Sequence, residues 1–482
     1  MNVTMILDMA AGADERPVVT AGGASLTAAR LRDRACVAAA WFKAYPAVLY
    51  TGANHLAYPI ALFGAAMAGV PFVPLNYRLG TEQLTALHAR HPGALVLSTD
   101  DDLAALVTEP QRVPEPDTGW DGDAVAVIIY TSGTTSEPKA ALLRHRHLLA
   151  YVLNTLEFGS AAPTDAALVA VPPYHIAGLT NLLSNLYSGR RVVYLPAFDA
   201  WSWLDTVRRE DVTHAMLVPT MLARIVAEAE RAETDVVVPS LQSLAYGGSR
   251  TPRQVLERAL RVFPDTGFVN AYGLTETASS VAVLGPDDHR TAAASGDPAV
   301  RERLGSVGRP LPGIEIEVRA ADGAPVGPGE TGLVFVRGEQ ISGEYGTRSA
   351  LDADGWFATR DLGRLDADGY LYIDGRADDT IIRGGENIAP AEIEDILLDH
   401  PGIDEAAVIG LPDPEWGQRL VAVVVGAGGR VGDPDDIRAW VQSRLRSSKT
   451  PDAIVFRAEL PRTETGKLLR RSLVTELENS HA

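Results

Sequence analysis

The chain of 482 residues contains 62 acidic and 43 basic residues, which give a net charge of −19 at pH 7. This length exceeds what one hydrophobic core usually organises, so we expect two or more domains. The negative charge repels nucleic acids and anionic membrane surfaces, so neither is an expected partner.

The only cysteine, Cys36, lies in an alanine-rich helical stretch and excludes an internal disulfide. The first 17 residues have Arg16 as their only base and lack the basic start of a signal peptide. The uncharged segment from Leu56 to Tyr77 could span a membrane by length, but its prolines and small residues predict a buried helix followed by a short strand. We therefore expect a cytoplasmic protein.

Strand-like runs alternate with longer helical stretches through the first 280 residues and predict an α/β fold with parallel sheets. These runs lie at 47–50, 70–73, 94–97 and 125–130. Three short strands punctuated by turns then predict a distorted antiparallel or barrel-like module, at 314–318, 332–336 and 370–373. Before this module we expect a mobile loop at 286–297.

After Asp374 the pattern changes again. The charged segment 375–379 precedes a stretch of mixed helix and strand that is long enough to fold on its own as a lid. We therefore predict an N-terminal domain over residues 1–375 and a C-terminal lid domain over residues 376–482.

A loop rich in glycine, serine and threonine runs from Tyr130 to Lys139, directly after the strand at 125–130. Its hydroxyls, its glycine and its final lysine suit a polyphosphate. The loop is not a Walker A sequence, because Pro138 stands where the second glycine is needed and Ala140 has no hydroxyl for magnesium. ATP must therefore be held in another way.

Two motif matches do not predict a site. Residues 327–332 satisfy G-x-G-x-x-G, but a proline lies inside and a strand follows, so we predict a turn. His145 and His147 are two residues apart on an expected helix and point to different faces, which argues against a shared metal ion. We predict a solvated helix start there.

The function of the loop is interpreted together with five further segments, at 246–249, 270–277, 355–361, 374–390 and 465–467. Together with the loop, and in this order, they resemble the adenylate-forming superfamily of acyl-CoA synthetases, luciferases and peptide-synthetase adenylation domains. The stand-alone acyl-CoA synthetases are the most similar. The resemblance runs from about Ala47 to Arg470 and implies stacked mixed or parallel α/β subdomains, a barrel-like module and a mobile α+β lid.

The nucleotide site is expected around Tyr272, whose flat ring beside Gly247 and Gly248 can form a slot one purine thick. Seen alone, a core tyrosine is an equally good interpretation. Asp361 can accept hydrogen bonds from both ribose hydroxyls, and Arg376 can donate to the same sugar. The resemblance implies that ATP is bound by Thr131, Ser132, Gly133, Thr134, Thr135, Lys139, Gly247, Gly248, Ser249, Asn270, Ala271, Tyr272, Gly273, Thr275, Asp361, Arg376 and Lys467.

The predicted catalytic residues are Lys467, His175, Thr275 and Glu276. A carboxylate that attacks the α-phosphate of ATP brings two anions together, so a cation such as Lys467 stabilises the transition state. The matching lysine of the family has this role, whereas an isolated lysine near a terminus is usually a surface residue. Glu276 would hold Mg²⁺ together with phosphate oxygens, although such a carboxylate alone is more often a solvated charge.

The resemblance places the acyl pocket at Tyr174, His175, Gly178, Val218, Tyr246, Gly247 and Ala278. These residues are largely small or apolar and predict a hydrophobic carboxylic acid. Peptide-synthetase domains carry Phe-Asp where this chain has Tyr174-His175, and losing that aspartate argues against an amino acid. His175 is either a packed histidine or, by resemblance, a pocket wall near the carboxylate.

The second half-reaction requires a thiol to reach the adenylate after the lysine has withdrawn. By resemblance, Asp378 is the hinge about which the lid replaces the Lys467 face with the face at 383–387. Glycines there let the backbone lie against a pantetheine arm. The predicted CoA-binding residues are Arg383, Gly384, Gly385, Arg444 and Lys449, although Arg444, Arg446 and Lys449 could equally form a general basic surface.

Three positions depart from the family pattern. Ser136 and Ala140 replace usual glycines of the phosphate loop, and Arg360 stands where a glycine commonly precedes the aspartate. The other functional residues remain, so we predict an ATP-dependent acyl-CoA synthetase that uses ATP, Mg²⁺ and CoA and no redox cofactor. A ligase that loads a carrier-protein phosphopantetheine and a noncatalytic nucleotide-binding protein remain alternatives, and the oligomeric state, a homodimer included, stays open.

Overall fold

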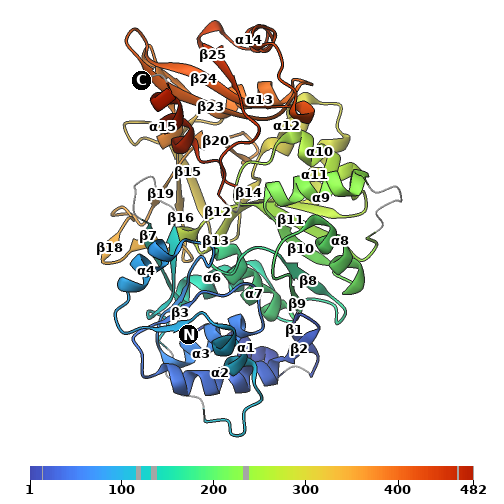
Figure 1. Cartoon of the computed structure of the whole chain (residues 1–482), viewed down its shortest axis with the longest axis vertical. Helices are drawn as coiled ribbons and strands as arrows, with labels where there is room; N and C mark the ends of the chain where they lie inside the picture. The colour runs from blue at the N-terminus through green and yellow to red at the C-terminus, as the bar shows by residue number, and fades with distance from the viewer. Residues whose placement is uncertain (13–14, 116–120, 132–137, 232–237, 464–465, 481–482) are drawn as a thin grey trace.

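The structure is a computed structural model that describes residues 1–12, 15–115, 121–131, 138–231, 238–463 and 466–480. It is a mixed α/β protein with several sheets in a large N-terminal domain and a small C-terminal domain, which confirms the predicted fold class. Figure 1 shows the C-terminal domain, in orange and red, at the end of the molecule opposite the N-terminus.

A seven-stranded sheet contains the first predicted strands, in the order β18-β17-β7-β6-β4-β3-β5. Strands β3 to β6 pair in parallel, and β7 and β17 add antiparallel strands at one edge. The strands are β3 (Val48–Tyr50), β4 (Phe72–Pro74), β5 (Leu95–Leu97), β6 (Val125–Thr131), β7 (Lys139–Arg144), β17 (Glu344–Tyr345) and β18 (Arg348–Ser349). The predicted alternation of strands and helices is thereby confirmed.

The membrane-like segment forms helix α3 and strand β4, as predicted. Residues 57–67 of α3 are all buried, which explains their apolar composition. No helix within the described ranges is long and apolar enough to cross a membrane. The helices around this sheet are α1 (Thr4–Ala11), α2 (Ala28–Phe42), α3 (Ala57–Ala68), α4 (Thr81–Ala89), α5 (Asp100–Val107), α6 (His145–Thr155) and α7 (Ile176–Ser188).

A nine-stranded sheet follows, in the order β14-β13-β12-β11-β10-β8-β9-β1-β2, and its central strands are parallel. Its strands are β1 (Pro17–Ala21), β2 (Ala24–Thr27), β8 (Ala166–Val169), β9 (Arg191–Tyr194), β10 (His214–Leu217), β11 (Ser243–Gly247), β12 (Gly267–Leu274), β13 (Ser279–Leu284) and β14 (Arg309–Pro310). Its helices include α8 (Ala200–Arg209), α9 (Pro219–Arg231) and α10 (Arg253–Val262). One hydrophobic core joins both sheets through α2, α3 and α7.

The predicted strand-rich module is a four-stranded antiparallel sheet in the order β15-β16-β19-β20. Its strands are β15 (Glu315–Arg319), β16 (Gly332–Arg337), β19 (Phe357–Leu365) and β20 (Leu371–Arg376). Strand β16 starts at Gly332, so the strand expected after the G-x-G-x-x-G match is present. The core of this sheet includes Val281 and Ala282 of β13, which fixes the sheet against the nine-stranded one.

Two local predictions are wrong. Residues 286–297 are not a mobile loop throughout, because Pro286–Ala294 form helix α11, followed by α12 (Pro298–Glu302). A proline at the first helical position and two aspartates in the first turn favour that helix start. His145 and His147 begin α6 as expected, but both are 2% exposed and not solvated.

The C-terminal domain has two small sheets with hydrophobic clusters of its own, and neither cluster contains a residue before Ile381. Its strands are β21 (Ile381–Arg383), β22 (Glu386–Ile388), β23 (Ile403–Asp413), β24 (Gly417–Gly426) and β25 (Ala453–Phe456). Its helices are α13 (Pro390–Leu398), α14 (Pro434–Gln442) and α15 (Arg470–Ser480). Separate cores agree with a part that can turn as one body.

Candidate active site

The candidate active site lies at the carboxyl ends of β10, β11 and β12, where the C-terminal domain meets the large domain. Parallel strands of α/β proteins present ligand-binding loops at this edge. Val218 follows β10, Gly248 follows β11, and Thr275 and Glu276 follow β12. The sequence motifs at these positions are therefore brought to one edge of one sheet.

A linked group of polar side chains marks the expected ribose position. Asp361 and Arg376 are register partners on β19 and β20, and Arg376 Nη1 lies 2.9 Å from Asp361 Oδ1. Tyr272 donates its hydroxyl to Asp361 Oδ2 at 2.5 Å. Asp361 is only 5% exposed, and burial raises its pKa, while the charge of Arg376 opposes the shift. The Asp361 carboxylate and the Arg376 guanidinium are therefore held side by side, where they could bind the two hydroxyls of a ribose.

Glycines let the strands approach closely beside Tyr272. A Cβ on Gly247 would collide with the carbonyl oxygen of Ala271, and Gly248 has a φ of +89°, which favours glycine. The Asn270 side chain donates to the carbonyl of Ser306 at 3.0 Å, so it connects the middle of β12 to the segment before β14. Ser249 and Gly273 flank this group, in the segments that follow β11 and end β12.

The phosphate side is only partly described. Ser132, Gly133, Thr134 and Thr135 lie outside the described residues. Thr131 and Lys139 are cross-strand partners at the ends of β6 and β7. The Lys139 ammonium lies 5.8 Å from the centre of the Tyr345 ring.

Glu276 lies in a one-turn helix (Thr275–Thr277), and its carboxylate accepts a hydrogen bond from the Tyr345 hydroxyl. Within the described ranges no cluster of three or more histidine, cysteine or acidic side chains could hold a metal. Mg²⁺ in nucleotide sites needs only one or two carboxylates, because phosphates and water supply the other oxygens. The single carboxylate therefore fits this role. Tyr345 had no recognisable motif in the sequence.

Lys467 reaches this group from the C-terminal domain. Its side chain keeps access to solvent, yet the surrounding protein lowers its pKa, and the charge of Arg376 acts in the same direction. The carboxylates of Asp379, Asp361 and Glu276 oppose this shift. The ammonium thus lies within electrostatic range of residues from both domains.

The Lys467 loop is docked on the large domain. Gly466 has a φ of +79°, and a Cβ there would collide with the Thr220 side chain at the start of α9. Arg462 Nη1 donates to the Gly466 carbonyl at 2.9 Å, and the Lys467 amide donates to Thr463 Oγ1 at 3.0 Å. Residues 462, 463, 466 and 467 are therefore held by these hydrogen bonds, and Gly466 contacts Thr220, two residues after Val218.

The predicted acyl-pocket residues do not all lie in the same surroundings: Tyr174 and His175 lie at the start of α7, whereas Tyr246 lies in the core of the nine-stranded sheet. His175 occupies the position before the first residue of α7 without a capping side-chain hydrogen bond, and its ring centre lies 4.6 Å from that of Tyr174. Burial lowers the pKa of His175 to about 4, so the ring is neutral at neutral pH. Tyr246 is 1% exposed and shares a hydrogen bond of 2.8 Å with His289, which places it in the core of the nine-stranded sheet.

The small residues predicted for the acyl pocket lie in tight backbone turns. A Cβ on Gly178 would lie 2.9 Å from the Pro172 carbonyl oxygen. Ala278 has a φ of 52°, and the next residue, Ser279, has a φ of 126°. Such values are costly outside glycine and gather at functional sites. Arg360, with a φ of 63°, is a third case in this region.

A cavity of about 570 Å³ lies between the large domain and the Lys467 loop. Its walls include Tyr77, Arg78 and Arg224 from the large domain, and Arg462 and Gly466 from the C-terminal domain. A space of this size and polarity can admit part of a charged substrate next to Gly466 and the predicted catalytic residue Lys467.

Asp378, the predicted hinge residue, follows β20 in a short turn of helix. Its carboxylate lies 3.7 Å from the Arg360 guanidinium. Further along, Arg250 of the large domain forms an ion pair with Asp395 of α13. The Gln254 side chain donates to the Leu398 carbonyl at 2.6 Å. These contacts hold the C-terminal domain in the pose that brings Lys467 to the site.

The predicted CoA-binding side chains make contacts within the C-terminal domain. Arg383 lies 2.7 Å from Asp452, Lys449 lies 2.5 Å from Glu392, and the Arg444 guanidinium lies 3.3 Å from the centre of the Trp440 ring. Gly384 and Gly385 both have positive φ.

An aromatic side chain that sequence analysis missed, Trp416, is 46% exposed beside this turn. A Cβ on Gly384 would lie 2.9 Å from its ring. The only sequence signal for it was an isolated tryptophan in a loop.

The chain matches the AMP-binding enzyme family over residues 8–345 and that family's C-terminal domain over residues 392–467. A feruloyl-CoA synthase from an Amycolatopsis species is 37% identical over 476 residues, covering 93% of both chains. A fatty acid–acyl-carrier-protein ligase from Streptomyces coeruleorubidus is 32% identical over 458 residues, covering 88% of this chain and 86% of its own.

Among solved structures, the o-succinylbenzoate CoA synthetase of Bacillus subtilis, in complex with an acyl-adenylate intermediate, superposes with a TM-score of 0.83. The two sequences are 29% identical, and the match covers 97% of each chain. The similarity therefore extends over both domains.

Proposed function

Since this chain belongs to the AMP-binding enzyme family and is an AMP-forming acid–thiol ligase, we propose that it activates a hydrophobic carboxylic acid as acyl-AMP and transfers the acyl group to CoA. The observation that carries the proposal is the contact of Gly466 with Thr220, which places the next residue, Lys467, within electrostatic range of Arg376, Asp361 and Glu276.

In the first half-reaction an oxygen of the acid attacks the α-phosphorus of ATP, and the bond to the leaving pyrophosphate breaks. Lys467 stabilises the negative charge that gathers where the two anions meet. Asp361 and Arg376 hold the ribose, and the Tyr272 ring stacks on the base. Mg²⁺, held by Glu276, would neutralise phosphate charge.

In the second half-reaction the thiol of CoA attacks the acyl carbonyl carbon, and AMP leaves. Lys467 must first withdraw, because the thiol needs the space that its loop occupies beside Thr220. We propose that the lid turns about Asp378 and brings the Gly384–Gly385 turn to the site. Gly385 has open space where a Cβ would stand, so a narrow pantetheine arm can pass, and the exposed Trp416 offers an apolar wall.

Arg78 and Arg224 of the large domain keep their places when the lid turns. They line the cavity beside the catalytic loop and are suitable partners for the phosphates of CoA. In this pose Arg383, Arg444 and Lys449 make contacts within the lid, and they remain the predicted CoA-binding side chains of that domain.

The substrate is proposed to be a hydrophobic acid, because the residues predicted to line the acyl pocket include His175, which is neutral at neutral pH, and Tyr174, Gly178 and Ala278. The feruloyl-CoA synthase relative makes an aromatic acid such as ferulate the first to test. The carrier-protein ligase relative supports a second acceptor, the phosphopantetheine of a carrier protein, with the same adenylation chemistry.

The decisive experiment is a screen of aromatic, alicyclic and alkyl acids monitored by pyrophosphate release, with CoA, with a phosphopantetheinyl carrier protein, or with no acceptor. We expect one class of hydrophobic acid to release pyrophosphate and to give a thioester with CoA. A thioester that forms only on the carrier protein would show that the carrier protein, and not CoA, is the acceptor. ATP binding without pyrophosphate release from any acid would contradict the proposal.

A further inference from the structure

Tyr345 lies between Glu276, the proposed metal ligand, and Lys139 at the start of β7. Its hydroxyl donates a hydrogen bond to Glu276 Oε1, and its ring lies 5.8 Å from the Lys139 ammonium. It comes from β17, which pairs with β7 through Tyr345 and Ala141, two residues after Lys139. One side chain therefore hydrogen-bonds Glu276 and lies near Lys139, the two groups that would face the pyrophosphate.

The segment that carries Tyr345 also holds the backbone of Glu276. The amides of Ser342 and Gly343 donate to the Glu276 carbonyl at 2.8 and 3.2 Å. The Ser342 hydroxyl donates to the Leu142 carbonyl on β7. Glu276 is thus fixed at its main chain and at its carboxylate by residues 342–345, and this segment is tied to the strand that leaves the phosphate loop.

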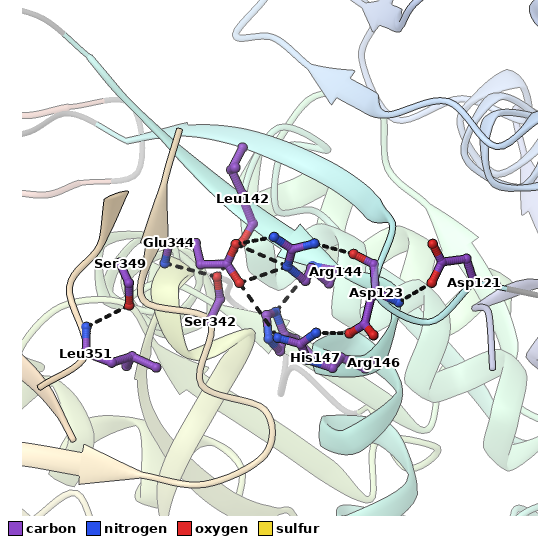
Figure 2. A network of polar contacts seen from close by, with 10 residues as sticks. All are labelled: Asp121, Asp123, Leu142, Arg144, Arg146, His147, Ser342, Glu344, Ser349 and Leu351. Atoms are coloured by element: carbon purple, nitrogen blue, oxygen red, sulfur yellow. Dashed lines mark hydrogen bonds and ion pairs between the residues drawn. The ribbon is translucent and has the colours of Figure 1, made fainter. Parts of the chain in front are cut away.

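A polar network on the other side of this segment keeps it in place (Figure 2). Arg144 donates from Nε and Nη2 to the Glu344 carboxylate at 2.9 and 2.7 Å. Arg146 lies 3.8 Å from the same carboxylate and pairs with Asp123. The hydrogen bonds from Arg144 lower the pKa of Glu344, so this anchor stays ionised. Tyr345 therefore projects toward Glu276 from a fixed backbone.

We propose that Tyr345 is a positioning residue for adenylation, whose hydroxyl holds Glu276 Oε1 so that the other carboxylate oxygen is presented to Mg²⁺. This inference rests on the proposed function, since it assumes a magnesium nucleotide at Glu276. The alternative is that Tyr345 only fills space, in which case a phenylalanine of the same shape would serve equally well.

The test replaces the hydroxyl and keeps the ring, with the variant Tyr345→Phe. Calorimetry measures the affinity for ATP in the presence of Mg²⁺ and in the presence of EDTA. Partners that orient metal ligands typically change metal affinity 10- to 100-fold, so we expect the gain in affinity due to Mg²⁺ to fall about tenfold. Affinity in EDTA should stay unchanged, because Tyr345 acts through Glu276.

The matched control is Tyr370→Phe, which removes a hydroxyl that donates to the Asp288 carboxylate at 2.6 Å away from the site. It should keep the full magnesium effect. In a Glu276→Gln background, Tyr345→Phe should have no further effect on the magnesium dependence. Equal magnesium effects in Tyr345→Phe and in the parent would overturn the inference, whereas a parent protein without any magnesium effect would instead refute the metal assignment of the proposed function.

Discussion

Among single residues, Arg360 has a backbone conformation that its residue type disfavours. Thr359, Arg360 and Asp361 of β19 face the single residue Val334, which makes a bulge in which Arg360 has a φ of 63°. Glycine is the usual residue in this conformation, and another residue costs about 1 kcal/mol. The arginine gains a contact with Asp378, the proposed hinge residue, in return. We interpret it as a weak tie that favours the observed lid pose.

The variant Arg360→Gly should shift the balance between the two half-reactions. Both partners are exposed, at 57% and 43% of their side chains, so the pair contributes about 0 to 1 kcal/mol. We expect adenylation to slow and thioester formation to accelerate, each by up to about fivefold. Single-turnover rates of the two steps measure this. Arg360→Lys keeps the charge and should behave as the parent, and an unchanged ratio in Arg360→Gly would contradict the tie.

At the scale of elements, the two domains meet through a few local contacts. The pair Arg250–Asp395 joins the segment before α10 to α13, and Gly466 packs on Thr220 at the start of α9. Each contact would break when the lid turns. The contact at Gly466 has the more direct consequence, because Lys467 is the next residue.

The variant Gly466→Ala should lose adenylation while the protein stays folded. Its Cβ would collide with Thr220, and its φ of +79° also strains an alanine. Gly429→Ala is the matched control, because Gly429 has a φ of +75° in the same domain and nothing within 4 Å of a built Cβ.

Both glycine variants should lose a similar free energy of unfolding, of about 1 kcal/mol. Only Gly466→Ala should slow pyrophosphate release, by about tenfold or more. Equal slowing in both variants would show that the docked loop has no special role.

At the scale of the whole molecule, buried neutral histidines make stability depend on pH. Burial lowers the pKa of His145 and His147 to about 4, and both accept hydrogen bonds from backbone amides, of Val3 and Arg144 respectively. The unfolded chain binds protons at these groups near pH 6.5, whereas the folded chain does not. Their contribution is therefore complete above about pH 6.5 and is lost as the pH falls toward 4.

We expect the free energy of unfolding to drop between about pH 7.5 and 5.5 by on the order of 1 kcal/mol per buried histidine. Urea unfolding at the two pH values measures it. Asp361 and Asp395 have raised pKa values, so their titration changes the free energy of unfolding in the opposite direction. The contribution of one histidine is therefore measured by comparing the parent with His147→Gln. That variant should show a smaller drop than the parent, and an equal drop would show that His147 titrates normally in the folded protein.

Much of the fold could be predicted because it depends on local patterns. The strands at 47–50 and 125–130 and the buried helix in the membrane-like segment have periodicities that the sheets preserve. The site motifs were visible for the same reason, since the ends of β11 and β12 are short continuous segments. The burial of His145 was not visible, because it depends on Val3 from a distant part of the chain.

Tyr345 was missed for a related reason. Its role arises from the pairing of β17 with β7, which joins residues about two hundred positions apart, and pairing over such separations leaves no local pattern. For Tyr246 the sequence motif was visible, but the position of the side chain was not. The motif at 246–249 is at the site, but the Tyr246 side chain alternates to the core face of β11 and bonds His289.

In the proposed function Lys467 serves adenylation alone, and the variant Lys467→Ala checks this when the two half-reactions are measured separately. We expect acid-dependent ATP–pyrophosphate exchange to fall at least about 100-fold, because a preorganised charge at the reacting anions is removed. Thioester formation from supplied acyl-AMP and CoA should stay within about twofold of the parent, since an interaction absent from that step contributes nothing to it. Equal loss of both steps, or exchange at the parental rate, would contradict the account.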